Sequence, residues 1–112
     1  MAPDLAAFEN LRLELRRGCL VLAVLAELKH ERYGYTLRTR LEEHGISIDE
    51  GTLYPLLRRL EAQGLLQSEW REENRRKKRF YRLTKAGKPV LTALLEELKE
   101  LNASLDRITQ EA

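Results

Sequence analysis

The chain contains one stretch, Ser47 to Leu66 (SIDEGTLYPLLRRLEAQGLL), that restricts the fold more than any other. Its leucines recur at the i, i+3, i+4 and i+7 positions, the spacing of an amphipathic helix with a single buried stripe. The stripe consists of Leu53, Leu56, Leu57 and Leu60. The stretch therefore predicts a helix that turns one face to a core and the other to the outside.

The opposite face of this helix carries cations, a phenolic hydroxyl and small residues, at about 100° per residue. It comprises Gly51, Tyr54, Pro55, Arg58, Arg59 and Ala62. Such a face suits the major groove of DNA, although a solvated basic face is an equally good interpretation of these residues alone. Pro55 crowds the carbonyl group of Gly51, which predicts a local distortion of the first turns.

A second helix is predicted directly before this one, over residues 34–43. Gly45 stands where the left-handed residue after a helix belongs. The next helix then starts with a capping box of Ser47 and Glu50, or with Asp49 as a rival cap. Two short helices joined by a tight turn that contains glycine form a helix-turn-helix.

The residues before the helix-turn-helix predict two helical segments that are separated at Gly18. The first, residues 4–16, is capped by Asp4 and carries an apolar stripe. This stripe consists of Leu5, Phe8, Leu11 and Leu15. The second, Cys19 to Lys29, is apolar nearly all round, which predicts a buried helix with Cys19 as a small core residue. The segment HERYGY is interpreted as a polar turn.

Two short strands, Leu65 to Arg71 and Arg79 to Leu83, are predicted after the helix-turn-helix. The loop between them, EENRRKKR, contains five consecutive cations, Arg75 to Arg79. Two strands and a loop directly after a helix-turn-helix form the wing of a winged helix-turn-helix. A basic wing binds phosphates or inserts an arginine into the minor groove, and a solvated loop is the alternative interpretation. The aromatic residues Trp70, Phe80 and Tyr81 are expected to pack the hairpin against the helices.

The last helix is capped by Thr84 and carries a heptad seam. The seam residues follow one another in steps of 3, 4, 3, 4 and 3: Leu91, Leu94, Leu98, Leu101, Leu105 and Ile108. Such a seam needs a second helix, and symmetric homodimers are the commonest solution. Packing on the chain's own first helix is the alternative, and we expect both terminal helices to share the interface.

Composition narrows the class of protein. At 112 residues, with 43% apolar and 34% charged residues and a net charge of +2, the chain is one globular domain. Its one cysteine fits a reducing cytoplasm, and neither a signal peptide nor a membrane span is expected. No sequence signature of an enzyme, metal site or cofactor is present, and His30 and His44 are interpreted as surface or cap residues.

Several runs of residues resemble the PadR family of transcriptional regulators. They are YGYTLRTRL, EGTLYPLLRRLEAQGLL, SEW with the basic loop, and FYRLTKAGKPVL, and they span roughly residues 18–95. The resemblance implies a dimeric repressor from a bacterium or archaeon that binds palindromic operators, in some members with release by a small-molecule effector. It also implies DNA contacts near Tyr35, at the start of the helix in the Ser47–Leu66 stretch, and at the wing tip. The residues concerned in that helix are Gly51, Thr52, Tyr54 and Pro55, and those at the wing tip are Arg75 to Lys78.

One departure from the family is visible at the C-terminus. The single long C-terminal helix resembles that of the smaller PadR proteins, where it forms most of the dimer interface. Multidrug-binding members have a tryptophan in this helix that sandwiches flat ligands between subunits. Residues 85–112 of this chain contain no aromatic residue. The resemblance therefore does not extend to a flat-drug site at the dimer axis.

Together these observations predict a mainly α-helical chain with a two-stranded β wing. We expect an N-terminal interface helix (1–17), a winged helix-turn-helix (18–84) and a C-terminal dimerisation helix (85–112). The expected partners are an operator in double-stranded DNA, a second copy of the chain and, as an open option, an effector. A module for protein interaction, or a ligand-independent architectural protein, is the rival interpretation.

The expected site residues follow from the same reasoning. Those expected to bind DNA are Tyr35, Arg38, Gly51, Thr52, Tyr54, Pro55, Arg58, Arg59, Arg75, Arg76, Lys77 and Lys78. Those expected at the dimer interface are Leu5, Phe8, Leu91, Leu94, Leu98, Leu101, Leu105 and Ile108. The protein is expected in the cytoplasm, on the nucleoid when it is bound to DNA.

Overall fold

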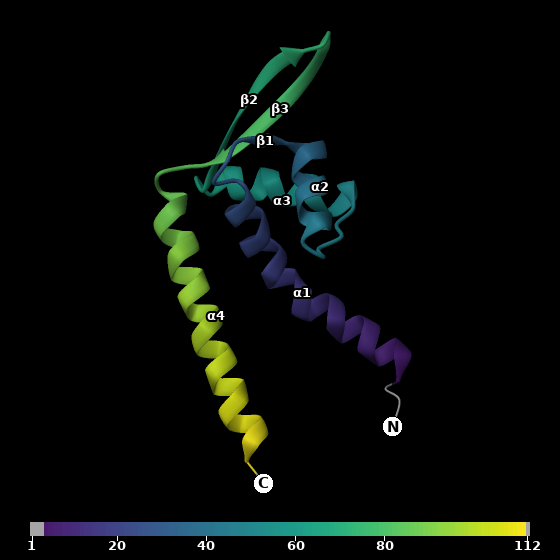
Figure 1. Ribbon diagram of the computed structural model, residues 1–112, viewed down its shortest axis with the longest axis vertical. Coiled ribbons are helices and arrows are strands. Elements are labelled where there is room, and N and C mark those ends of the chain that lie inside the picture. The colour runs from purple at the N-terminus through teal and green to yellow at the C-terminus, as the bar shows by residue number, and fades with distance from the viewer. Residues whose placement is uncertain (1–3, 112) are drawn as a thin grey trace.

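The computed structural model describes residues 4–111, so residues 1–3 and 112, at the outer ends of the predicted segments 1–17 and 85–112, lie outside the described residues. The elements in that range are α1 (Leu5–Glu27), β1 (Arg32–Tyr33), α2 (Gly34–Glu43), α3 (Glu50–Ala62), β2 (Leu66–Glu73), β3 (Arg76–Leu83) and α4 (Gly87–Gln110). A small helical core lies between a projecting β hairpin and two long helices that run the other way (Figure 1).

Helix α1 is continuous, so the predicted break at Gly18 is wrong. One glycine costs a helix only about 1 kcal/mol relative to alanine, and this helix is 23 residues long. The prediction for Cys19 is also wrong, because its side chain is exposed. Only the C-terminal end of α1, with Val24 and Leu25, is fully buried. The apolar residues of the Cys19 segment therefore lie only partly in the core, and the rest of them face outward.

The helix-turn-helix forms as the sequence indicates, with α2 over the predicted residues. Asp49, not Ser47, is the N-cap of α3, and its carboxylate accepts a hydrogen bond from the Thr52 backbone N–H at 3.1 Å. Helix α3 therefore begins three residues later than the predicted stretch. It also runs through Pro55 without interruption, so the predicted distortion does not break the helix.

Both helices of this unit end in the same hydrogen-bonded turn. Gly45 and Gly64 adopt φ angles of 81° and 80°, the left-handed region that favours glycine. The residue after each glycine then donates its backbone N–H to a carbonyl group five positions back, from Ile46 to Leu41 at 2.8 Å and from Leu65 to Leu60 at 3.0 Å. These turns fix where α2 and α3 stop.

The leucine stripe of α3 forms the centre of the core. All four of its leucines are buried, and Leu53 and Leu57 have no exposed surface. They pack with leucines from every other helix and from the sheet, which include Leu25, Leu37, Leu41, Leu66 and Leu91. The predicted orientation of α3 is therefore confirmed, since its leucines face inward.

The sheet has three antiparallel strands in the order β1-β3-β2, one more than predicted. The extra strand, Arg32–Tyr33, pairs with Tyr81 and Phe80 of β3, so part of HERYGY is not a simple turn. The hairpin turn consists only of Asn74 and Arg75, which both have positive φ. The predicted loop is thus mostly strand, and Arg76 already belongs to β3.

The aromatic residues of the hairpin do not share one role. Tyr81 is buried in the helical core, as the sequence predicts. Phe80 is also buried, but on the other face of the sheet, where its ring packs edge-on against Tyr33 of β1 at a centroid distance of 5.3 Å, so its predicted packing against the helices is wrong. Trp70 is 62% exposed, so its predicted packing role is wrong. It lies near the outer part of the hairpin, with the Arg79 guanidinium 5.6 Å from its ring centroid.

Helix α4 starts at Gly87 with Ala86 as its N-cap, two residues after the predicted cap Thr84. The Thr84 hydroxyl still accepts a hydrogen bond from the Gly87 N–H at 2.9 Å. Leu91 is 2% exposed and belongs to the core of its own chain, so its predicted place in a dimer interface is wrong. The rest of the seam leaves the core. Leu94 is 37% exposed and Leu98 is half-buried, whereas the exposed fraction reaches 52% at Leu101 and 65% at Ile108.

The shape of the chain reflects these uncovered helices. Its radius of gyration is 16.7 Å, whereas a compact chain of this length has about 13 Å. Leu5 and Phe8 at the start of α1 are 74% and 47% exposed. The ends of α1 and α4 therefore present apolar surface beyond the reach of the core.

We expect Leu57→Ala to lower the free energy of unfolding by about 2–5 kcal/mol, because it leaves a cavity at the centre of the core. Leu13→Ala, at a leucine that is 61% exposed, is the matched control and should change it by less than about 0.5 kcal/mol. Urea unfolding followed by circular dichroism, at one fixed protein concentration, measures both variants. Equal losses would contradict the assignment of the core.

Candidate nucleic-acid interface

The outer face of α3 is accessible over its whole length. Gly51, Thr52, Pro55, Arg58 and Arg59 are all exposed. Within residues 4–111, neither arginine of this face makes an ion pair. Arginine carries five N–H donors in a planar fork that fits phosphates and guanine edges. These two arginines are therefore free to bind an anionic partner.

Tyr54, also predicted to bind DNA, is half-buried. Its hydroxyl lies against Gly34, where a Cβ atom would collide with it. A glycine at the start of α2 thus allows α3 to approach closely. Tyr54 holds the two helices together, and its expected contact with DNA stays a prediction.

Arg38 holds the turn between α2 and α3. It donates hydrogen bonds to the Ile48 carbonyl oxygen at 3.2 Å and to the Glu50 carboxylate at 3.1 Å. The hydrogen bond from Thr52 and, to a much smaller extent, the charge of Arg38 lower the pKa of Asp49. Because its side chain stays 30% exposed, a phosphate contact by Arg38 remains a prediction.

Tyr35 connects the start of α2 to the wing. Its side chain is 70% exposed and its ring stacks on Tyr33, with centroids 6.5 Å apart. The Lys78 ammonium lies 4.4 Å from the Tyr33 ring centroid. Tyr35, Tyr33 and Lys78 therefore form one continuous surface between the helix-turn-helix and the hairpin.

The five predicted wing cations divide into two groups. Arg75, Arg76 and Lys77 are exposed at the tip. Lys78 is 21% exposed and pairs with Glu73 at 3.6 Å, whereas Arg79 pairs with Glu61 of α3 at 3.0 Å. Glu72 and Glu73 lie opposite Lys77 and Arg76 in the strand register. The tip therefore keeps a positive charge that opposing carboxylates reduce.

A hydrogen-bonded ring joins the hairpin to α3, and the sequence did not reveal it. Glu61 accepts hydrogen bonds from Ser68 at 2.6 Å and from Arg79 at 3.0 Å, and Arg79 also donates to Ser68 at 2.9 Å. Beside the ring, burial raises the pKa of Tyr81. The sequence could have indicated this ring only through the register of β2 and β3. That register depends on the length of the hairpin turn, which is not predicted correctly from the sequence.

A second contact fastens the other face of the hairpin. Arg71 donates to Glu31, just before β1, at 2.6 Å, and its guanidinium lies 4.6 Å from the Phe80 ring centroid. Hydrogen bonds to Glu31 and Glu69 raise the pKa of Arg71. Held on both faces, the wing keeps a defined angle to α3.

The long helices enclose an apolar groove of about 490 Å³. Its lining includes Leu15, Val21 and Leu22 of α1 and Leu94, Leu98 and Leu101 of α4. Leu98 and the neighbouring leucines of α4 therefore lie opposite α1 of the same chain, with this groove between the two helices. Both interpretations of the seam, self-packing and dimerisation, use these residues.

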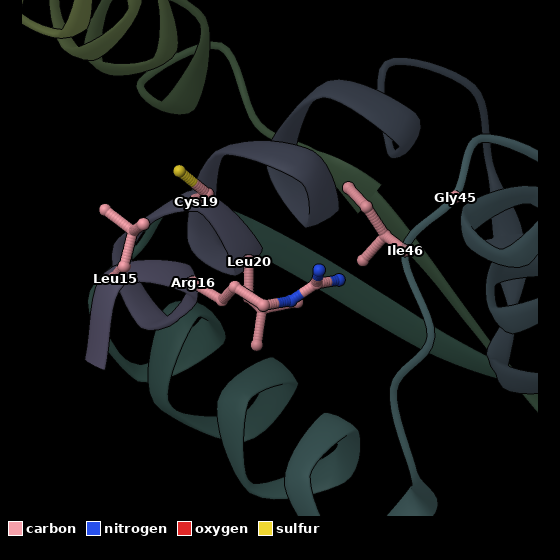
Figure 2. A pocket seen from close by; sticks show the side chains of 6 residues that line it. All are labelled: Leu15, Arg16, Cys19, Leu20, Gly45 and Ile46. Carbon is pink, nitrogen blue, oxygen red and sulfur yellow. The ribbon is translucent and has the colours of Figure 1, made fainter. Parts of the chain in front are cut away.

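A smaller pocket of about 280 Å³ lies where α1 passes the α2–α3 turn (Figure 2). Leu15, Cys19 and Leu20 line it from α1, and Gly45 and Ile46 line it from the turn. In Figure 2 the Arg16 side chain extends from α1 toward this turn. Among residues 4–111 no cluster of three or more His, Cys, Asp or Glu side chains could hold a metal ion.

The comparisons with known proteins agree with this geometry. Residues 21–93 match the Transcriptional regulator PadR-like family. The chain is 43% identical over 89 residues to the Transcriptional regulator Rv3488 of Mycobacterium tuberculosis, across 79% of this chain and 83% of that protein. In the part of the chain that the structure describes, no helix is long and apolar enough to cross a membrane.

Solved structures show the same fold. The crystal structure of a PadR family transcriptional regulator from Eggerthella lenta superposes with a TM-score of 0.90 at 40% identity, over 96% of both chains. A PadR-like transcription factor from Bacteroides fragilis superposes with a TM-score of 0.76 at 35% identity, over 88% of this chain and 98% of that one. These likenesses confirm the winged helix-turn-helix. The chain belongs to the PadR-like family of transcriptional regulators.

Proposed function

We propose that the protein is a homodimeric repressor that binds a palindromic operator in double-stranded DNA. The observation that carries this proposal is the combination, in one chain, of a cation-bearing face on α3, a basic wing tip beside it and an uncovered leucine seam on α4. The seam holds two copies of α3 a fixed distance apart. In such a dimer this distance matches successive major grooves, about 34 Å.

The exposed residues divide between reading bases and holding the backbone. Arg58 pairs with a guanine through two hydrogen bonds, which is worth about 1–3 kcal/mol of discrimination. Thr52 and Tyr54 reach bases or nearby phosphates, and the small Gly51 and Pro55 let the helix approach. The remaining expected contacts, from Tyr35, Arg38, Arg59 and the wing tip, hold phosphates and set the register.

The interface of the proposed dimer consists of one apolar stripe on α1 and one on α4. On α4 it contains Leu94, Leu98, Leu101, Leu105 and Ile108, and on α1 it contains Leu5 and Phe8. All of these residues except the half-buried Leu98 are exposed in the single chain, which supports this assignment, because a soluble chain rarely leaves so large an apolar surface in water. The partner's helix fills the groove between α1 and α4.

A small-molecule effector fits this arrangement as a further proposal. An effector releases the operator if it binds better to a dimer whose reading helices are wrongly spaced. The absence of aromatic residues from 85–112 argues against a flat ligand stacked between the two α4 helices. We also propose that the protein acts in the cytoplasm of a bacterium or archaeon.

The proposal is tested with a fluorescence anisotropy titration on the duplex upstream of the protein's own gene. The titration is run at several salt concentrations with random-sequence competitor. Tight binding that survives the competitor supports a specific regulator. Binding that the competitor removes points to an architectural role or another operator, and no binding at low salt favours the rival protein-interaction module.

Neutralising the wing tip with Arg75→Ala, Arg76→Ala and Lys77→Ala should weaken DNA binding and its salt dependence together. Each phosphate contact contributes about −0.9 to the slope of log K against log salt, so a dimer that loses three per subunit loses about 5 units. The matched control changes three exposed lysines elsewhere, Lys29, Lys88 and Lys99, to alanine. An unchanged slope in the wing variant would refute phosphate binding by the wing.

Leu98→Glu should convert the dimer into a monomer and abolish specific DNA binding, because the charge lies in the middle of the seam. Light scattering after size exclusion measures the mass. Ala103→Glu is the control, since Ala103 is exposed on the opposite side of α4. A Leu98→Glu protein that stays dimeric at micromolar concentration would show that the interface lies elsewhere.

A further inference from the structure

Three segments that are distant in sequence meet where α4 begins. Thr84 donates its backbone N–H to the Leu65 carbonyl oxygen at 3.0 Å, and Leu83 donates to the Leu28 carbonyl oxygen at 2.8 Å. These bonds connect the start of α4 to the turn that ends α3 and to the end of α1. The junction between Thr84 and Gly87 therefore links the proposed reading helix directly to the proposed dimerisation helix.

The Thr84 side chain completes this junction. Its hydroxyl donates to the Gly64 carbonyl oxygen at 2.7 Å, with the Leu65 carbonyl oxygen 3.1 Å away, and accepts from the Gly87 N–H at 2.9 Å. One hydroxyl group thus holds the last turn of α3 and the first N–H of α4 together. A threonine needed only as a helix cap would make the last of these bonds alone.

Gly87 brings the two elements into close contact. It is buried, and a Cβ atom there would collide with the Leu65 carbonyl oxygen and lie 2.7 Å from the Leu83 Cδ1 atom. The first contact is with backbone, which cannot move aside as a flexible side chain does. Any larger residue must therefore push the start of α4 away from the end of α3.

A small change here is amplified by the length of α4. The helix has 24 residues and is about 36 Å long at 1.5 Å per residue. Tilting it by about 5° at its start moves its far end by about 3 Å, close to the 3.4 Å rise of one base pair. Most of the uncovered seam lies beyond Leu94, toward that far end.

We propose that Thr84 and Gly87 are positioning residues that set the separation of the two reading helices, and with it the spacing between half-sites that the dimer accepts. This inference rests on the proposed function as a DNA-binding dimer. Neither residue touches DNA. They act through the angle between α3 and α4.

The first measurement needs no DNA. A nitroxide label on Arg59→Cys, in a Cys19→Ser background, reports the distance between the two α3 helices of the full-length dimer by pulsed electron resonance. Thr84→Val and Gly87→Ala should shift the mean distance by about 3 Å or broaden its distribution. Thr92→Val is the matched control, because its hydroxyl bonds only the Lys88 carbonyl oxygen within α4.

The second measurement uses unlabelled protein and duplexes selected by the wild-type protein from a randomised library. Two copies of the selected half-site are separated by spacers that vary in steps of one base pair. The wild type and Thr92→Val should share one preferred spacing, whereas Thr84→Val should shift or broaden it. A residue with a merely structural role would lower stability without changing the preferred spacing.

The outcomes separate the inference from the proposed function. Label distances and preferred spacings that match the wild type in both variants would overturn the inference and leave the proposed function standing. Failure of the wild type to select any duplex would contradict the proposed function, and the label distance would still decide the role of the junction. If Gly87→Ala does not fold, the result for Thr84→Val alone decides whether the inference holds. If the labelled wild type gives no dipolar signal, the protein is not a dimer of this kind, which overturns both the inference and the proposed function.

Discussion

Burial of the leucine stripe on α3 is the constraint on which the rest of the structure depends. Leu53 and Leu57 have no exposed surface, and each contributes about 1.5–3 kcal/mol by leaving water. Their positions fix the rotation of the helix about its axis. A rotation by one residue would turn Arg58 toward the core, where an unpaired charge costs several kcal/mol. The face that we propose to bind DNA is thus determined by the buried leucines of the same helix.

Features with a local cause could be predicted from the sequence. The bounds of α2, the left-handed glycine at 45, and the inward face of α3 depend on residues a few positions apart. The orientation of Arg58 and Arg59 followed from the same periodicity. The expected DNA-binding surface is therefore well defined on α3, where helical geometry alone places each side chain.

Features that depend on distant residues could not be predicted in this way. Gly18 signals a break only if its helix lacks other support. Leu91 belongs to the core only because the start of α4 is held to the end of α1 and to the turn after α3. The ring around Glu61 requires the register of β2 and β3, which the short turn at Asn74 sets. Hydrophobic periodicity shows that a residue is covered, but it does not show whether its own chain or a second copy covers it.

The placement of Trp70 has a practical consequence for optical studies of the protein. It is the only tryptophan in the chain, and it lies exposed on the hairpin beside Arg79 instead of in the core. Because indole emission responds to solvent around the ring, its intrinsic fluorescence reports events at the wing and changes little when the core melts. The fluorescence of Trp70 is therefore a poor measure of unfolding, but it reports directly on a molecule that binds to the hairpin.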